Sequence, residues 1–383
     1  MTLTIDIHAL QSLPPSNINR DDTGAPKSAI FGGVPRQRVS SQSWKRAIRR
    51  SFEEQMPADT VGYRTKQAAG LIGAAVLEQA GPGSSWTEET ADKAASEFLK
   101  AAGIKLSAPR RPRPTDAADA EAPHPQAEET GYLLFISPRQ ITRAAQHIIE
   151  HDGEKPLRKA AKEILDSEHS IDIAMFGRMV ADDASFNVDA AVQVAHAIGI
   201  HESEVDFDYF TAVDDVAEDE EETGAGMIGQ VQMMSSTLYR FATIDVASLH
   251  ENLGHETATE EAICAFLTSF IESLPSGKQN TFAHNTLPEL VYVTIRDTRS
   301  ISLVNAFEEP VAAADGQSRR ALGAQRLAAE ATQVSEQYGF TPTASFILGL
   351  GNLVDPFDGI ATRVTLPELT DRVRSALRAE VSA

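Results

Sequence analysis

Alternation of apolar and polar side chains near both ends of the chain constrains its fold more than any other feature. Leu3, Ile5 and Ile7 are separated by polar residues, and this period of two predicts a half-buried β-strand. The same alternation recurs at 171–175, 239–243 and 291–295, whereas residues 66–169 carry mostly helical patterns. Strands separated by such long segments are typical of an α+β core that carries insertions.

A short basic helix is predicted close to the first strand. Ser40 and Ser41 are residue types that cap helices, which places the helix at about 43–55. Trp44, Ile48 and Phe52 recur every four residues and form its apolar face. Lysine and arginine pairs at the same spacing occupy the other faces, where like charges repel each other. An anionic partner would explain why they are there.

Charge is distributed unevenly along the 383 residues. The net charge is −21, yet residues 1–50 sum to +5 and the remainder to −26. A basic stripe on an acidic body suits a protein that binds a polyanion along one groove. A solvated helix face would have the same composition, and charge alone does not separate the two interpretations.

Composition also sets expectations about location. Cys264 is the single cysteine, which rules out an intrachain disulfide and fits a reducing cytosol. The chain starts without a basic segment followed by an apolar one, and no apolar run is long enough to span a bilayer. We therefore expect a cytoplasmic protein that does not bind membranes.

Motifs for catalysis or cofactor binding are not found in the sequence. There is no Walker lysine motif, no dinucleotide fingerprint and no nucleophile elbow. His147 and His151 have helical i, i+4 spacing without further ligands, so a structural pair is expected there. Gly32-Gly33 is only a weak phosphate-loop pattern. We assign no catalytic residue, no metal ligand and no cofactor.

Residue types that bind phosphates cluster near the amino terminus. Arg20 and Lys27 flank a loop, and Ser40 and Gln42 stand at the predicted helix start, where free N–H groups and the helix dipole favour anions. Lys45 and Arg49 follow one and two turns later. Such a cluster holds successive phosphates without reading bases.

A second loop repeats this chemistry near the end of the chain. Lys278 and Gln279 follow Pro275-Ser276-Gly277. An ordinary turn lysine is the alternative interpretation of Lys278.

Several runs of residues together resemble one protein family. The chain is similar to the CasC (Cse-four) backbone subunit of type I-E CRISPR Cascade, which belongs to the Cas-seven group of the RAMP superfamily. The similarity extends over nearly the whole chain and is weakest across 66–165. The runs that carry it are Ser16–Asp22, Lys27–Gly33, Arg38–Ala47, Ile173–Met179, Ala195–Ile198, Phe207–Asp215 and Asn305–Glu308.

The resemblance implies a hand-like fold. An RRM-like or ferredoxin-like α+β palm would carry a helical fingers insertion and a protruding thumb hairpin. The palm would comprise 1–65, 170–195 and 237–383, the fingers 66–169 and the thumb 196–236.

The resemblance also implies a function without catalysis. Copies of the subunit would line up along CRISPR RNA and form the backbone of Cascade, leaving guide bases free to pair with target DNA. The partners would be CRISPR RNA, further copies, the large, small, five-prime cap and RNA-processing subunits, and target DNA through the guide.

Individual residues acquire roles through the same resemblance. Met179 would wedge against bases at the palm, and Tyr209 and Phe210 would serve the thumb. Basic residues at 110–113 and 155–162 would offer weak contact to duplex DNA. The remaining RNA-binding residues would be Arg20, Lys27, Ser40, Gln42, Lys45, Arg46, Arg49, Lys278 and Gln279.

Two other interpretations compete with an RNA-binding subunit. A RAMP-type endoribonuclease would use His8 as a general base, or Asp21 with a metal ion. A metabolic α/β enzyme with an incidental basic helix would need a cofactor motif, and the sequence contains none.

Overall fold

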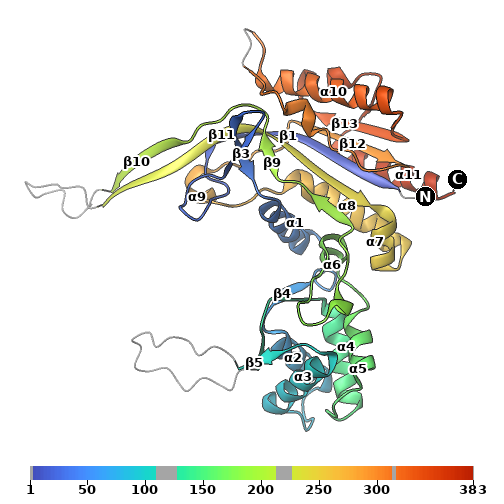
Figure 1. The fold of residues 1–383 in the computed structure, drawn as a ribbon. Helices are drawn as coiled ribbons and strands as arrows, with labels where there is room; N and C mark the ends of the chain where they lie inside the picture. Colours follow the sequence, from blue (N-terminus) through green and yellow to red (C-terminus); the bar gives the residue numbers. More distant parts are fainter. Residues whose placement is uncertain (1–2, 109–126, 213–226, 313–315, 383) are drawn as a thin grey trace, which may run out of the picture. The chain divides into compact units, whose positions relative to one another are not determined.

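The computed structural model describes residues 3–108, 127–212, 227–312 and 316–382. It contains two compact units, each built from separate segments of the chain (Figure 1). Unit 1 comprises Met1–Ser51, Val192–Ala247 and Ile263–Ala383, and unit 2 comprises Phe52–Ala191 and Ser248–Ala262.

Unit 1 contains a ferredoxin-like core, except that the last residues of its first helix and residues 256–262 of its second helix are in unit 2. The chain order β1 (Thr4–Ser16), α1 (Ser41–Gln55), β9 (Ala197–Gly199), β11 (Met227–Asp245), α8 (Glu256–Glu272) and β12 (Leu290–Arg296) is the β-α-β-β-α-β arrangement of that fold. The strands lie in the order β12-β1-β11-β9 with antiparallel neighbours. The α+β class and the ferredoxin-like core predicted from the sequence are confirmed.

Further strands widen this sheet on both sides. Beyond β12 lie β13 (Ala344–Gly349) and β14 (Thr362–Arg363), and beyond β9 lie β3 (Val34–Val39) and then β2 (Ser28–Phe31). The strands β8 (Val192–Val194) and β10 (Asp206–Ala212) each pair with β11. The helical elements that follow in unit 1 are α9 (Gln279–Phe282), η2 (Val304–Phe307), α10 (Arg319–Tyr338), η3 (Gly351–Phe357) and α11 (Leu366–Ser382).

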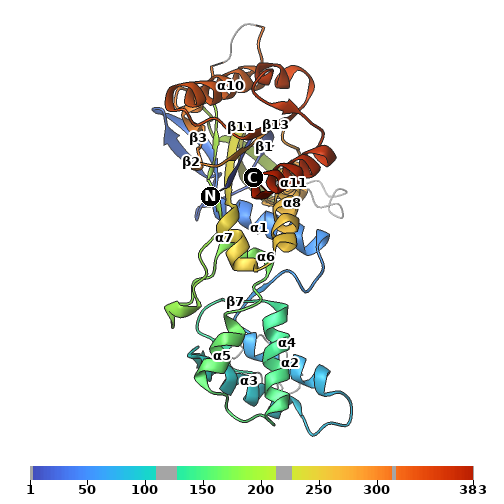
Figure 2. The same cartoon turned by 90° about the vertical axis from the view of Figure 1, so that its right-hand side faces the viewer.

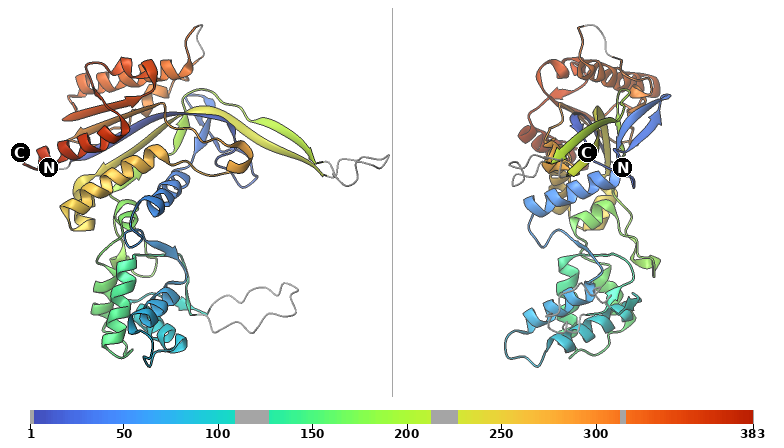
Figure 3. Two further views of the ribbon diagram at one scale, coloured as in Figure 1. Left: turned by 180° about the vertical axis from the view of Figure 1, so that it is seen from behind. Right: turned by 90° about the vertical axis from the view of Figure 1, so that its left-hand side faces the viewer.

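Helices cover both faces of the central strands (Figures 1 and 3). Leu10 of β1 belongs to a core with Leu327 of α10, and Leu13 belongs to a second core with Trp44 of α1. Strand β1 was predicted to be half-buried, and this was wrong, because Leu3 to Leu10 are buried on both faces. Alternation in the sequence reflects a polar strip inside the protein rather than a solvated face.

That polar strip is paired internally. The Arg296 guanidinium lies 3.3 Å from the Asp6 carboxylate, and His8 Nδ1 lies 2.8 Å from the Tyr239 hydroxyl. Burial, with a smaller contribution from Arg296, lowers the pKa of His8 to about 3. His8 is therefore a neutral component of the core.

Unit 2 is mainly helical (Figure 2). Its helices are α2 (Ala68–Ala80), α3 (Glu88–Ala102), α4 (Pro138–Glu150), α5 (Arg158–Leu165) and α6 (Ile171–Phe176), with η1 (Ala184–Phe186) and α7 (Val246–Leu253), the last of which begins in unit 1. Its short strands are β4 (Tyr63–Thr65), β5 (Leu106–Ser107), β6 (Glu129–Thr130) and β7 (Leu134–Ile136). Helix α3 begins with a capping box at Thr87, and α4 begins with one at Ser137.

The apolar run at 171–175 had suggested a strand, and this was wrong. Ser170 precedes helix α6, and Gly177 ends it with a φ of 79° while donating its N–H to the Ile173 carbonyl. A short apolar run does not distinguish a strand from a buried helix, so these flanking residues decide the conformation.

The predicted fingers segment, 66–169, lies within unit 2, and the predicted thumb segment, 196–236, lies within unit 1. Of the predicted palm segment 170–195, residues 170–191 are in unit 2. The division into palm, fingers and thumb remains a prediction. Across the described ranges, no helix combines the length and the apolarity needed to cross a bilayer.

Acid is expected to destabilise unit 1 through His8. Because its folded-state pKa lies below the ordinary value of about 6.5, the unfolded chain binds the proton first as the pH falls. Stability from this group is complete above pH ~6.5 and declines toward pH ~3, by up to about 1.4 kcal/mol per pH unit. Urea unfolding at several pH values measures the slope of the unfolding free energy against pH, which reports the protons taken up on unfolding. His8→Gln should lower that uptake by about one proton. An unchanged slope in that variant would contradict the assignment.

Candidate nucleic-acid interface

The loop between β1 and β2 is held by its own polar side chains. The Asn17 side-chain amide donates to the carbonyls of Gly24 and Gln232, each at 3.0 Å. The Asp21 carboxylate accepts from the Thr23 hydroxyl at 2.8 Å and from the N–H groups of Thr23 and Ala25 at 2.9 and 3.0 Å. These bonds fix a loop from which Arg20 projects into solvent.

The same loop is tied to the start of helix α1. Asn19 Oδ1 accepts a hydrogen bond of 2.8 Å from the Ser40 N–H, and the Ser40 hydroxyl accepts one of 3.3 Å from the Ser43 N–H. The Ser41 N–H donates to His196 Nδ1 at 3.2 Å. We had expected free N–H groups at this helix start, but these three have partners within the protein. Side chains must therefore make most of any anion contact there.

Those side chains form one basic surface. Gln42 and Arg46 are exposed, and Lys45 and Arg49 are half-buried. Burial lowers the pKa of Lys45, because the ammonium group loses hydration that a phosphate would replace. Helix geometry places Lys45 and Arg49 one turn apart on one face.

Arg38 and His196 extend this surface, although neither was predicted to bind RNA. Arg38 Nη1 lies 3.3 Å from His196 Nδ1. The pKa of His196 is lowered by burial and then by the positive charges of Arg38 and Lys27. A neutral His196 can accept from the Ser41 N–H, so it orients the helix start. The only sequence indication was its place in a run that carried the family resemblance.

Arg36 is one basic residue of the amino-terminal stripe that does not reach the surface. It is fully buried and donates to the carbonyls of Gly199, Phe307 and Glu308 at 2.9, 3.2 and 3.0 Å. A Cβ atom on Gly32 would lie 1.6 Å from the Glu308 carbonyl oxygen. Gly32 thus allows a close backbone contact, and Gly33 supplies the positive φ of 81° that the turn needs.

The loop around Lys278 lies against the first loop. A Cβ atom on Gly277 would stand 2.1 Å from the Ile18 carbonyl oxygen, so the two backbones are in direct contact. Lys278 has a φ of 51° and precedes the short helix α9, and Gln279 is exposed and donates to Asn285 Oδ1 at 2.8 Å. The structure therefore brings the Lys278 loop and the Arg20 loop to one site.

A small hydrophobic core packs beneath the first loop, α1 and the second loop. It contains Ile18 of the first loop, Trp44 of α1, and Leu274 just before the second loop; its other members are Leu13, Val39, Val194, Ala197 and Leu238. The buried Arg240 guanidinium stacks 3.7 Å from the Trp44 ring centroid and 4.2 Å from that of Phe270. Arg240 also donates to Gln11 Oε1 at 2.6 Å and to the Phe270 carbonyl.

The hairpin of β10 and β11 projects from the same sheet (Figure 1). Tyr209 is 63 % and Phe210 37 % exposed. Adjacent strand residues point to opposite faces, so the two rings do not form one wedge. Phe210 lies across Gly229, where a Cβ atom would approach its ring to 2.3 Å. Phe207, 54 % exposed, shares the Tyr209 face and was not predicted.

Other predicted contacts belong to unit 2 or lie outside the described residues. Met179 is in unit 2 and is 81 % exposed. Arg158 and Lys162 both pair with Asp183, and Lys155 pairs with Glu97, so these cations are partly neutralised. Residues 110–113, predicted to contact duplex DNA, are not among the described residues.

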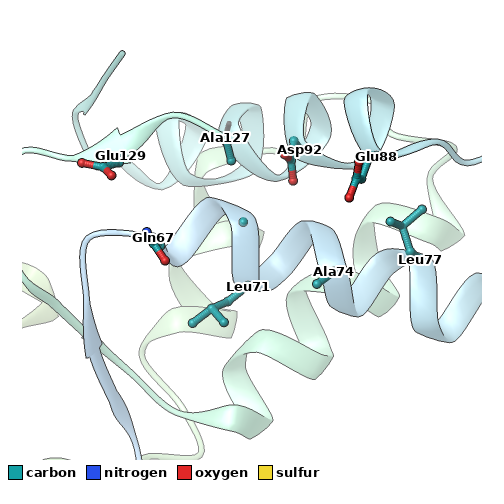
Figure 4. A pocket seen from close by; sticks show the side chains of 9 residues that line it. Gln67, Leu71, Ala74, Leu77, Glu88, Asp92, Ala127 and Glu129 are labelled. Carbon is teal, nitrogen blue, oxygen red and sulfur yellow. The ribbon is translucent and has the colours of Figure 1, made fainter. Parts of the chain in front are cut away.

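A hollow of about 320 Å³ in unit 2 has the wrong charge for RNA (Figure 4). Its wall carries Glu88, Asp92 and Glu129 above the apolar side chains of Leu71 and Leu77. Burial and then the charge of Glu88 raise the pKa of Asp92. A polyanion would be repelled here.

His147 and His151 contact each other at the end of α4. Their ring centroids lie 4.1 Å apart with the planes tilted by 32°, and His151 Nδ1 bonds the His147 carbonyl at 2.8 Å. Within the ranges that the structure describes, no group of three or more His, Cys, Asp or Glu side chains is arranged to hold a metal ion.

The ferredoxin-like core, the projecting hairpin and the helical insertion together define a Cas-seven-type fold. The chain belongs to the family of CT1975-like proteins, whose model matches residues 5–372.

Two solved structures of similar chains carry related descriptions. One, described as "CRISPR RNA-guided surveillance complex, pre-nicking", is 33 % identical, with 97 % of this chain and 99 % of that chain covered and a TM-score of 0.79. Another, described as "CRISPR RNA-guided surveillance complex", is 29 % identical over the same shares, with a TM-score of 0.73. A search of curated proteins gave no match.

Removing the Trp44 ring should destabilise unit 1 and its basic surface together. Trp44→Ala would leave a cavity and uncover one face of the buried Arg240 guanidinium, with an expected loss of about 3–5 kcal/mol. Trp44→Phe keeps an aromatic face and should lose much less. The free energy of unfolding in urea measures both variants, and equal losses would contradict the role of the ring.

Proposed function

We propose that this protein is a non-catalytic, RNA-binding backbone subunit of a type I-E Cascade surveillance complex. Copies of it would line up along CRISPR RNA, with the large, small, five-prime cap and RNA-processing subunits as further partners. Family membership and the similarity to chains of surveillance complexes support an assignment to this class. The guide would carry the sequence information for binding target DNA.

The observation that carries the proposal is the convergence of basic residues from three segments. Arg20 and Lys27 come from the first loop, Lys45 and Arg49 from α1, and Lys278 from the second loop. Direct backbone contact at Gly277 and the bond between Asn19 and Ser40 join these segments. A surface that holds successive phosphates without reading bases would suit a guide of any sequence.

Aromatic side chains on the hairpin support the same proposal. Phe207 and Tyr209 lie on one face of β10, and their cross-strand neighbours on β11 are Gln232 and Gln230. Aromatic rings stack on nucleobases with little sequence preference. The hairpin would contact bases, while the loops and α1 hold phosphates.

A RAMP-type endoribonuclease is the alternative, and its two candidate residues are poorly placed. His8 is fully buried beside Tyr239 and cannot reach a scissile bond. The Asp21 carboxylate serves the turn at Thr23 and Ala25, and its pKa is lowered mainly by the Thr23 hydroxyl. Both groups therefore support the loop and the core.

Loss of two basic side chains on α1 should abolish co-purification of guide RNA. The double variant Lys45→Ala, Arg49→Ala removes two phosphate contacts, and for single strands each is worth about 0.7 in the slope of log K against log salt. The slope should therefore fall by about 1.4. Filter binding at several salt concentrations measures it.

A charge-matched control is available on other surfaces. Lys93 of α3 and Arg372 of α11 are exposed, and replacing both with alanine removes the same net charge. This control should retain RNA. Full RNA retention in the α1 double variant would contradict the proposed function.

Cleavage is tested directly. Labelled guide RNA and target RNA are incubated with the purified protein, with and without Mg²⁺, and should remain intact. Cleavage that His8→Gln or Asp21→Asn abolishes would instead establish the endoribonuclease.

A further inference from the structure

Strand β2 is an open edge of the main sheet. It stands last in the strand order, where β3 is its partner among the described strands. Its sequence, Ser28-Ala29-Ile30-Phe31, contains no charge and no proline, and Ile30 is 73 % exposed. Edge strands usually carry charges or proline that block pairing with another chain. This edge carries neither.

The register shows which backbone groups of β2 point outward. Phe31 faces Val34 across Gly32 and Gly33, whose φ values of 57° and 81° fit a two-residue type I′ turn. The pair that closes such a turn is hydrogen-bonded, and bonded pairs alternate along the ladder. The N–H and C=O groups of Ser28 and Ile30 therefore point away from β3. Pro35, which has no N–H, faces Ile30 as this register requires.

Strand β10 provides a second open edge in unit 1. In the described part of the chain it pairs with β11 alone. The Gln232 carbonyl accepts a hydrogen bond from Asn17 and therefore points away from β10. Phe207 is the residue of β10 that faces Gln232 in the register, so its backbone groups point away from β11. Its N–H accordingly donates to Asp206 Oδ1, at 2.8 Å. The outward groups of β10 are thus those of Phe207, Tyr209 and Thr211.

We propose that the β2 edge of one copy pairs with the β10 edge of a second copy, extending the sheet from subunit to subunit. This inference rests on the proposed function, which requires adjacent copies. Charge favours the pairing, since Lys27 directly precedes β2 while Asp206 and Asp208 lie on β10. Because the two edges differ, the contact is heterologous and can repeat along an RNA.

Proline substitutions at outward positions test each edge without breaking its own ladder. Ile30→Pro removes an outward N–H from β2, and Thr211→Pro removes one from β10. Ile30→Val and Thr211→Val keep those N–H groups and serve as matched controls. Sedimentation of each variant on a single-stranded RNA long enough for several copies gives the number of copies bound side by side.

Each proline variant alone should bind RNA only as isolated copies, whereas the valine controls should assemble like the wild type. A mixture of the two proline variants should yield complexes of two copies, because one intact β10 edge meets one intact β2 edge. This rescue also shows that both variants are folded.

Assembly of either proline variant like the wild type, or a mixture without two-copy complexes, would overturn the edge pairing. A different outcome would overturn the proposed function itself. In that case the wild type would bind no RNA, even as a single copy on a short strand.

Discussion

The contact on which the rest of unit 1 depends is the Arg240 guanidinium between the rings of Trp44 and Phe270. Burial lowers the pKa of Arg240 to about 9, so the charge is held at a cost that its partners offset. Those partners come from α1, α8 and β1, the last through Gln11. One side chain of β11 thereby fixes the helix that carries the basic surface against the sheet that carries the hairpin.

Polar residues near this core are scaffolding for the basic ones. Asn17, Asn19 and Asp21 occupy alternate positions of the first loop, and each makes hydrogen bonds within the protein. Glycines contribute in the same way at Gly32 and Gly277, where a side chain would collide with a neighbouring backbone. The lysine and arginine side chains therefore project from three segments, the two loops and α1, that hydrogen bonds and backbone contacts hold together.

Much of the fold was predictable because its patterns are local. The first strand, the apolar face of α1 and the helical character of 66–169 follow from period and capping. Errors arose where a tertiary contact competes with a local pattern. The run at 171–175 folds as a helix between Ser170 and Gly177, and β1 is covered on both faces by helices distant in sequence.

The sequence by itself determined that the chain has a basic segment next to a strand and an apolar helix face, since these features depend on residue order alone. Only the tertiary structure decided which members of that segment reach the surface. Arg36 is drawn inside by three backbone carbonyls, and Arg38 and His196 join the surface across β3 and β9. Pairing between distant strands sets these positions, and no local pattern records it.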